Sequence, residues 1–322
     1  MLIDDLLQMA AEQRASDLHL ISNQPPWLRI DNELRPLAIN PISAEECHAM
    51  LWAKLPADQR AALAKKIEID FASTVHQIRF RANVYYQQQG LAAAFRLLPQ
   101  ITPSFASLQL PTIFPSLCQH TQGLILITGA TGSGKSTTLA ATINHLNHTQ
   151  AKHIITIEDP IEFIYSNQHC LITQREVNRE TQSFQLALRA ALRQDPDIIL
   201  IGELRDLETI RLALTAAETG HLVFATLHTA SAAKTLARIV DVFPGNEKDA
   251  IRTMLAESLV AVISQQLLPR SPAGRIGAFE ILICTPAIRN LIRENKTSQI
   301  YSAMQTGHAS GMCTMEQYIA RL

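Results

Sequence analysis

The sequence lacks a long uninterrupted apolar run. None of its apolar stretches, in 322 residues, approaches the roughly 18 to 20 residues that a membrane-spanning helix needs. Residues 1–13 also carry three acids where a secretory signal peptide carries positive charge. We therefore expect a soluble, cytoplasmic protein.

Paired cysteines and an excess of charge are absent too. The five cysteines never form C-x-x-C, so neither a zinc ribbon nor a dithiol redox site is indicated. Lys plus Arg number 28 against 29 Asp plus Glu, which disfavours a broad nucleic-acid-binding face. With 47% apolar and 18% charged residues, the composition is that of an ordinary globular protein, and the length allows two domains.

Composition divides the chain into three parts. Residues 1–99 mix helical periodicity with adjacent strand-like segments, which is typical of a compact α+β domain. Residues 100–115 have the proline-rich composition of an interdomain linker, and their apolar residues indicate partial packing. Residues 116–322 alternate apolar runs with helical stretches, which predicts an α/β domain with a mostly parallel sheet. From about residue 246 the pattern predicts helices.

Local patterns predict individual elements in both domains. In the first domain we expect helices at 3–16, 44–55 and 57–67, and strands at 17–21, 27–37 (with a turn at Asp31–Asn32), 69–75, 76–90 and 91–99. In the second domain, short continuous apolar runs predict buried strands at 124–128, 153–158, 198–202 and 222–227.

The stretch GATGSGKST matches the phosphate-binding pattern G-x-x-x-x-G-K-[ST], between a strand-like and a helical segment. Its glycines allow successive N–H groups to curl around an anion, and the following helix adds its positive end. Lys135 is expected to reach the β- and γ-phosphates, and Ser136 to ligate Mg²⁺. The sequence thus predicts a site for ATP and Mg²⁺ made by Gly129, Ala130, Thr131, Gly132, Ser133, Gly134, Lys135, Ser136 and Thr137.

Three polar residues directly follow predicted strands: Glu158, Glu203 and His228. Because ligands of open α/β sheets bind beyond the carboxyl ends of the strands, we expect these groups to converge with Lys135. One carboxylate can orient or deprotonate the attacking water, and the other can hold Mg²⁺ through its waters. His228 is the γ-phosphate candidate. His221 precedes the same strand, about 23 Å away at roughly 3.3 Å per residue, and belongs at the opposite edge.

Two pairs of arginines stand out. Arg189 and Arg193 lie one turn apart on a predicted helix that stops at Pro196, and form either a solvated basic edge or a contact to phosphate or a neighbouring subunit. Arg81 and Arg96 lie on strand-like stretches of the first domain and read as surface residues unless a second subunit presents them to the nucleotide. An arginine supplied in trans is worth about 10³ to 10⁵ in rate in the best-studied cases.

The stretch TPAIRNLIRENK, residues 285–296, predicts a helix far beyond the phosphate-binding loop. Thr285 can cap it, and Pro286 suits its first position. Arg289 and Arg293 share one face, while the apolar face is formed by Ile288, Leu291 and Ile292.

Taken in order, GATGSGKST, TIEDPIEF, ALRAALRQDPDIILIGELRD, TAAETGHLVFATLHTASAAKTLARIVDVFP and AIRNLI resemble the secretion-superfamily ATPases, and most closely the PilT-type retraction ATPases of type IV pili. The resemblance runs from SDLHL to IYSAMQTG and covers nearly the whole chain. It implies an α/β fold: a RecA-like P-loop ATPase domain, a smaller N-terminal α+β domain of PAS-like type, and a helical C-terminal portion. It also implies a homo-hexameric ring.

The resemblance also implies roles for the residues singled out above. Glu158 is the expected general base and Glu203 the Mg²⁺-associated or water-positioning acid, although the two roles could be exchanged. His228 is the expected γ-phosphate sensor. Four arginines are expected to complete the catalytic set. Arg81 and Arg96 correspond to N-terminal-domain arginines that act in trans, and Arg189 and Arg193 correspond to a pair in the ATPase domain.

The implied function is a hexameric ATP-hydrolysing motor for type IV pilus retraction. It would work at the cytoplasmic face of the inner membrane, held there by the pilus platform protein and the pilus base, without nucleic acid. One alternative is an assembly or secretion ATPase, which is disfavoured because the chain lacks a four-cysteine zinc module. Another is a nucleotide-gated structural partner with little turnover, which the intact catalytic residues disfavour. AIRNLI is similar to a segment tied to retraction, in which Arg289 and Asn290 are expected to transmit motion or contact the pilus machinery.

Overall fold

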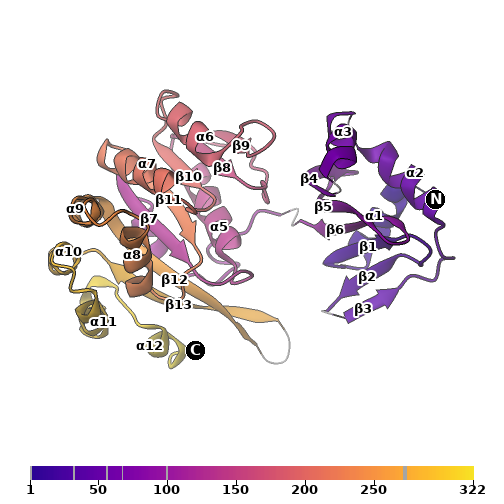
Figure 1. Ribbon diagram of the computed structural model, residues 1–322. Coiled ribbons are helices and arrows are strands. Elements are labelled where there is room, and N and C mark those ends of the chain that lie inside the picture. Colours follow the sequence, from indigo (N-terminus) through magenta and orange to yellow (C-terminus); the bar gives the residue numbers. More distant parts are fainter. Residues whose placement is uncertain (1, 32, 56, 67, 99–100, 271–273) are drawn as a thin grey trace. The chain divides into compact units, whose positions relative to one another are not determined.

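The computed structural model describes residues 2–31, 33–55, 57–66, 68–98, 101–270 and 274–322. The chain divides into two compact units, Met1–Ile101 and Thr102–Leu322, which Figure 1 shows in different parts of the colour scale. The boundary expected at Pro99 and Gln100, and Asn32 of the expected turn, lie outside the described residues. In the part of the chain that is described, no helix is both long and apolar enough to cross a membrane.

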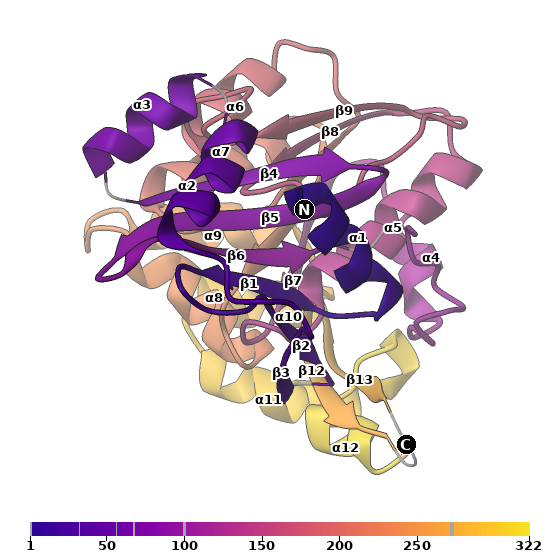
Figure 2. The same ribbon diagram turned by 90° about the vertical axis from the view of Figure 1, so that its right-hand side faces the viewer.

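The first unit is a six-stranded antiparallel sheet with three helices on one face. The strand order is β3-β2-β1-β6-β5-β4. Figure 2 shows α1 and α2 in front of this sheet. The elements are α1 (Ile3–Glu12), β1 (Asp17–Ile21), β2 (Trp27–Ile30), β3 (Glu33–Pro36), α2 (Ala44–Lys54), α3 (Ala57–Lys66), β4 (Glu68–Val75), β5 (Ile78–Gln87) and β6 (Gly90–Leu97).

Alternation along these strands gives the sheet one apolar and one charged face. Phe80, Val84 and Phe95 are buried in the core that the helices cover. Arg81 and Arg96 point the other way, because successive side chains of a strand leave opposite faces. The two arginines are direct cross-strand partners, and Arg96 is in turn the partner of Asp17 on β1. The structure therefore places Arg81 and Arg96 side by side on the charged face.

The second unit contains a seven-stranded sheet of order β13-β12-β7-β11-β10-β8-β9, in which only β13 runs antiparallel. Its strands are β7 (Gly123–Thr128), β8 (His153–Glu158), β9 (Leu171–Glu176), β10 (Ile198–Ile201), β11 (Leu222–Leu227), β12 (Leu259–Pro269) and β13 (Arg275–Ile283). Its helices are α4 (Ile113–Leu117), α5 (Lys135–Thr149), α6 (Phe184–Ala191), α7 (Leu207–Glu218), α8 (Ala232–Asp241), α9 (Lys248–Ser258), α10 (Pro286–Arg293), α11 (Thr297–Thr306), the 3₁₀ helix η1 (His308–Ser310) and α12 (Met315–Ile319).

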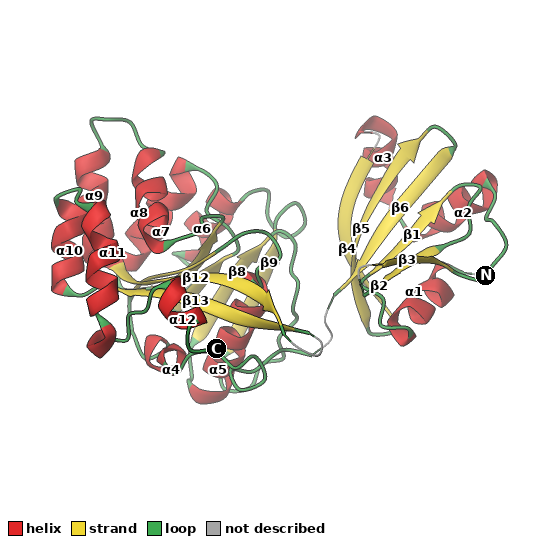
Figure 3. Cartoon of the chain, turned by 90° about the horizontal axis from the view of Figure 1, so that it is seen from below, coloured by secondary structure: helices red, strands yellow, loops and turns green. Residues whose placement is uncertain are grey.

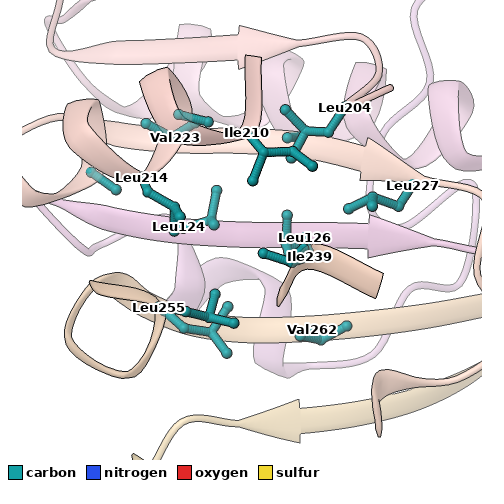
Figure 4. Close-up of a cluster of buried hydrophobic side chains, with 14 of the residues drawn as sticks. Leu124, Leu126, Leu204, Ile210, Leu214, Val223, Leu227, Ile239, Leu255 and Val262 are labelled. Carbon is teal, nitrogen blue, oxygen red and sulfur yellow. The ribbon is translucent and has the colours of Figure 1, made fainter. Parts of the chain in front are cut away.

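Helices cover both faces of this sheet, as Figure 3 shows. Leu124 and Leu126 of β7 point to the core beneath α6–α10, part of which is drawn in Figure 4. Ile125 and Ile127 point to the core beneath α4, α5 and α12. Burial on both faces explains why the central strands appear in the sequence as continuous apolar runs.

The proline-rich segment belongs to the second unit from Thr102 onward and packs against α5. Phe105 stacks on His145 of α5 with ring centroids 4.7 Å apart, and lies 5.6 Å from Phe114. Asn144 donates a hydrogen bond of 2.9 Å to the carbonyl of Pro103. The partial packing expected from the apolar residues of this segment is therefore observed.

The expectation of helices throughout the chain from residue 246 is wrong for Leu259–Pro269 and Arg275–Ile283. These residues form β12 and β13, which pair over nine positions. Residues 259 and 261–265 are all buried, so the run carries no period that separates a strand from a buried helix. The helical portion begins at α10. Strand β9 was not expected either, and α6 ends at Ala191, short of the expected stop at Pro196.

Candidate active site

The loop between β7 and α5 has the backbone geometry of a phosphate-binding loop. Gly129, Gly132 and Gly134 adopt positive φ values of 146°, 79° and 89°, a region that favours glycine. A Cβ atom would lie 2.3 Å from the Gln265 carbonyl oxygen at Gly129, and 2.8 Å from Gln265 Nε2 at Gly134. The pattern of glycines is thus explained by backbone conformation and by the close approach of β12.

Lys135 begins α5 and folds back into the loop. Its Nζ donates hydrogen bonds to the carbonyls of Gly129, at 2.8 Å, and Ala130, at 3.0 Å. Burial lowers the pKa of Lys135, and the negative charges of Glu203 and Glu162 oppose that shift. The ammonium is therefore held inside the curl of the loop, where it can meet phosphate oxygens.

His228 joins Lys135 to Glu203. His228 Nδ1 lies 3.4 Å from Lys135 Nζ, and His228 Nε2 lies 3.2 Å from Glu203 Oε1. An ammonium can only donate, so His228 accepts at Nδ1 and donates from Nε2. Arg205 holds the other carboxylate oxygen of Glu203 at 2.9 Å and lies 3.8 Å from Asp159. The expected convergence of Lys135, Glu203 and His228 at one sheet edge is observed.

Glu158 lies at the end of β8 and is turned toward β9. Its Oε1 accepts hydrogen bonds from Thr156 Oγ1, at 2.6 Å, and from Gln174 Nε2 on β9, at 3.4 Å. Burial raises the pKa of the Glu158 carboxyl to about 7. A carboxyl group with a pKa near neutrality can accept a proton at the working pH. Glu162, four residues further on, carries a charge that acts on both Glu158 and Lys135.

Arg189, Arg193 and His221 make no hydrogen bond to the phosphate-binding loop among the described residues. Arg189 pairs with Glu208 of α7, and Arg193 donates to the Arg189 carbonyl at 2.9 Å. Arg81 and Arg96 belong to the first unit. His221 lies at the amino end of β11, as expected, with Nδ1 3.0 Å from the Ala216 carbonyl.

The helix predicted at residues 285–296 is α10. The Thr285 side chain caps it, and its apolar face is buried, with Ile288 0% and Ile292 2% exposed. Arg289 crosses to the end of α9, where it donates to the carbonyls of Ala256 and, at 2.6 Å, Glu257. The expected docking of this helix through its apolar face is observed.

Three residues around the loop were missed in the sequence. Glu162 belongs to the TIEDPIEF motif, and its position four residues after Glu158 could have indicated a second carboxylate near the site. Arg205 follows Glu203 by two residues and could have been considered as its counter-charge. Gln265 gave no local signal, because it lies more than 125 residues from the loop it contacts, in a segment expected to be helical.

The loop fits a triphosphate, and its surroundings fit a magnesium ion. Ser133 Oγ is buried and has no hydrogen-bond partner in the described residues, so a donor inside the loop is free for an incoming oxygen. Ser136 is exposed on the first turn of α5, and Glu203 supplies a carboxylate that is joined to Lys135 through His228. Mg²⁺ takes few protein oxygens and keeps several waters, so this sparse donor set suits it. When bound, the metal would neutralise charge on the phosphates.

Comparison with known proteins identifies the class. The family model described as "Type II/IV secretion system protein" matches residues 1–277. The chain belongs to this family.

Within this family, the chain is similar to proteins of type IV pilus retraction and twitching motility. The chain is 51% identical to the type IV pilus retraction ATPase PilT of Pseudomonas aeruginosa, over 99% of this chain and 93% of that protein. It is 50% identical to a twitching motility protein of Neisseria gonorrhoeae, over 98% of this chain and 85% of that protein. A crystal structure of the pilus retraction motor PilT with bound ADP superimposes with a TM-score of 0.94 at 47% identity, covering 100% of this chain and 92% of that one.

These comparisons confirm the expected resemblance to PilT-type ATPases. They also confirm the fold class, a larger ATPase domain preceded by a smaller α+β domain. The C-terminal region differs from the expectation, because the strands β12 and β13 precede its helices α10, α11 and α12.

Proposed function

We propose that the protein is an ATP-hydrolysing motor for type IV pilus retraction and twitching motility. One observation carries this proposal. Lys135 in the loop, His228 after β11 and Glu203 after β10 are joined in a chain of contacts, in a protein 51% identical to a PilT retraction ATPase. A loop that binds a triphosphate beside a histidine that links its lysine to a carboxylate is built to respond to the γ-phosphate.

In this proposal the residues of the site divide the work. The loop, Lys135 and the positive end of α5 bind the phosphates of ATP. Ser136 and Glu203 would hold Mg²⁺, which would neutralise charge on the phosphates. His228 senses the γ-phosphate, because any oxygen that draws Lys135 away also changes the contact between His228 and Glu203. Glu158 and Glu162 are the candidates for accepting the proton of the attacking water.

The active form in this proposal is a homo-hexamer in which each site is completed by a neighbour. Arg81 and Arg96 are adjacent and exposed on the charged face of the first unit. They are the arginines we propose to act in trans on the phosphates. Arg189 and Arg193, on and just after α6, are the second pair at the subunit interface. Their present partners, Glu208 and a backbone carbonyl, lie on the surface and can be exchanged.

The proposed location is the cytoplasmic face of the inner membrane. Association with the membrane is peripheral and passes through the pilus platform protein and the pilus base, which are the proposed partners. The near balance of 28 basic and 29 acidic residues gives no reason to include nucleic acid among them.

The test of this function combines a biochemical and a cellular measurement. Purified protein should hydrolyse ATP in the presence of Mg²⁺, and Lys135→Ala should lose both binding and hydrolysis. The wild-type gene, but not the Lys135→Ala gene, should restore twitching to bacteria that lack their own retraction ATPase. Restored pilus assembly in bacteria that lack their own assembly ATPase would instead favour an assembly ATPase. ATP binding without turnover would favour a nucleotide-gated structural partner.

A further inference from the structure

Gln265 on β12 lies against the phosphate-binding loop and uses both ends of its amide. Its Nε2 donates a hydrogen bond of 2.7 Å to the carbonyl of Ser133, within the loop. Its Oε1 accepts a hydrogen bond of 2.8 Å from Thr138 Oγ1, on the first turns of α5. Gln265 is only 5% exposed. The Ser133 carbonyl can only accept a hydrogen bond, so it requires the NH₂ end of this buried amide, whereas the Thr138 hydroxyl can donate to the Oε1 end.

The position of Gln265 in the sheet explains how it reaches the loop. Strand β12 pairs with β7 as far as Ser264 opposite Thr128. At that point β7 ends and the loop begins, whereas β12 continues. Gln265 is therefore the first residue of β12 that has the loop beside it in place of β7, while its other side still pairs with β13. The Gln265 carbonyl and amide are the atoms that a side chain at Gly129 or Gly134 would strike.

The hydrogen bond to Ser133 fixes a peptide plane. In a trans peptide the C=O of one residue and the N–H of the next point in opposite directions. The peptide between Ser133 and Gly134 is trans, because the only cis bond in the described chain precedes Pro160. With the Ser133 carbonyl directed at Gln265, the Gly134 N–H points away from β12, to the opposite side of the peptide. N–H groups directed into such a loop are the donors that bind phosphate.

We propose that Gln265 is a positioning residue for nucleotide binding: it holds the Ser133–Gly134 peptide in the orientation that presents its N–H to phosphate. The inference rests on the proposed nucleotide-binding function and deepens it. Gln265 acts through the loop backbone and makes no contact with the reacting atoms. Thr138 supports it, because its hydroxyl gives the buried Oε1 of Gln265 a hydrogen-bond partner and so helps to hold the side chain in place.

The chain supplies a matched control. Gln266 is the next residue of β12, is half-buried, and projects from the opposite face of the strand. Gln265→Leu removes both hydrogen bonds at nearly constant volume. Gln265→Glu keeps the shape but sets a carboxylate oxygen against the Ser133 carbonyl. Thr138→Val leaves Gln265 in place and removes only its partner. Gln266→Leu makes the same chemical change on the other face.

The experiment measures two quantities in the full-length protein. The first is the affinity for ADP, by isothermal titration calorimetry. The second is amide hydrogen exchange of residues 129–137 without nucleotide, which reports how firmly the loop is held. We expect Gln265→Leu and Gln265→Glu to weaken ADP binding about tenfold or more and to speed exchange in the loop, as expected when a buried hydrogen bond worth a factor of ten is lost. Thr138→Val should show a smaller effect in the same direction, and Gln266→Leu none.

Affinity and loop exchange that remain unchanged in both Gln265 variants would overturn the proposal, as would equal effects in Gln266→Leu. If neither Gln265 variant folds, Thr138→Val decides by the same two measurements. Failure of the proposed function looks different. In that case the wild type would bind no ADP, whereas faster exchange in the nucleotide-free Gln265 variants would still show that this residue holds the loop.

Discussion

Asp17 on β1 and Arg96 on β6 face each other in register, and Arg96 Nε donates a hydrogen bond of 2.9 Å to Asp17 Oδ1. Asp17 is 8% exposed, whereas 70% of the Arg96 side chain is exposed. A guanidinium held at Nε directs its two terminal nitrogens outward, and this fork matches the oxygens of a phosphate. In the proposed function, this contact leaves the two terminal nitrogens of Arg96 available for phosphate oxygens.

We expect Arg96→Ala to remove activity that depends on assembly. In the wild type, ATPase activity per molecule should rise steeply with protein concentration as subunits complete each other's sites. In Arg96→Ala that rise should disappear, with a loss of about 10³-fold at high concentration, because the transition-state charge is no longer neutralised. Arg35→Ala, which changes an exposed arginine on β3, is the control. Activity that is independent of concentration and of Arg96 would rule out catalysis in trans.

The proton acceptor can be assigned with three matched variants. We expect Glu162→Gln to lose about 10²-fold or more in kcat with ADP affinity retained, because its charge acts on Lys135 in the loop. Glu158→Gln should lose less, since its carboxyl is turned to Gln174 on β9. Glu203→Gln should change the Mg²⁺ dependence of activity. A larger loss in Glu158→Gln than in Glu162→Gln would assign the base to Glu158.

The buried carboxyl of Glu158 predicts a pH-dependent stability. Its pKa rises from the ordinary 4.5 to about 7 on folding, so between these values the folded protein binds this proton more tightly than the unfolded chain. The stabilisation is complete below about pH 4.5 and is lost as the pH rises through about 7. Between about pH 5 and pH 8 we expect the thermal midpoint to fall less in Glu158→Gln than in the wild type. Glu45→Gln, at an exposed position on α2, should follow the wild type, and a Glu158→Gln curve parallel to it would contradict the assignment.

Arg289 offers a test of whether hydrolysis and retraction are separable. Its guanidinium caps the carbonyls at the end of α9, so Arg289→Ala should cost about 1 to 3 kcal/mol of stability. It should keep ATPase activity within about twofold, since the nucleotide loop is at the other edge of the sheet, and should lose twitching in cells. Arg293→Ala, an exposed change one turn along α10, is the control for stability. Loss of hydrolysis in Arg289→Ala would contradict the separation of roles.

The positions of site residues that belong to a contiguous motif, or that directly follow a predicted strand, could be predicted from the sequence. The loop at 129–137 is a contiguous motif, so its place between a strand and a helix followed directly. Glu203 and His228 could be predicted to meet because parallel strands end at one edge, and the contact through His228 Nε2 shows that they do. The alternation of β5 and β6 likewise placed Arg81 and Arg96 on strands.

Features that depend on distant pairing could not be predicted in the same way. Strand β12 is buried on both faces and therefore lacks the period that separates a strand from a helix. Without β12 in the sheet, nothing connects Gln265 with the loop. The direction of the Glu158 side chain also depends on β9, a strand that the sequence did not reveal. The missing information is tertiary, and it concerns which segment lies next to which.

The continuation of β12 past the end of β7 has a consequence for any attempt to reduce this protein to a smaller nucleotide-binding fragment. A fragment ending at Ser258 would keep every residue of the phosphate motif, together with α5, Glu203 and His228. It would lose the contacts that β12 makes with the loop, because Gln265 and its backbone lie in the segment that follows Ser258. The shortest unit able to shape this loop therefore extends through the last strands of the sheet, far beyond the motif that identifies it.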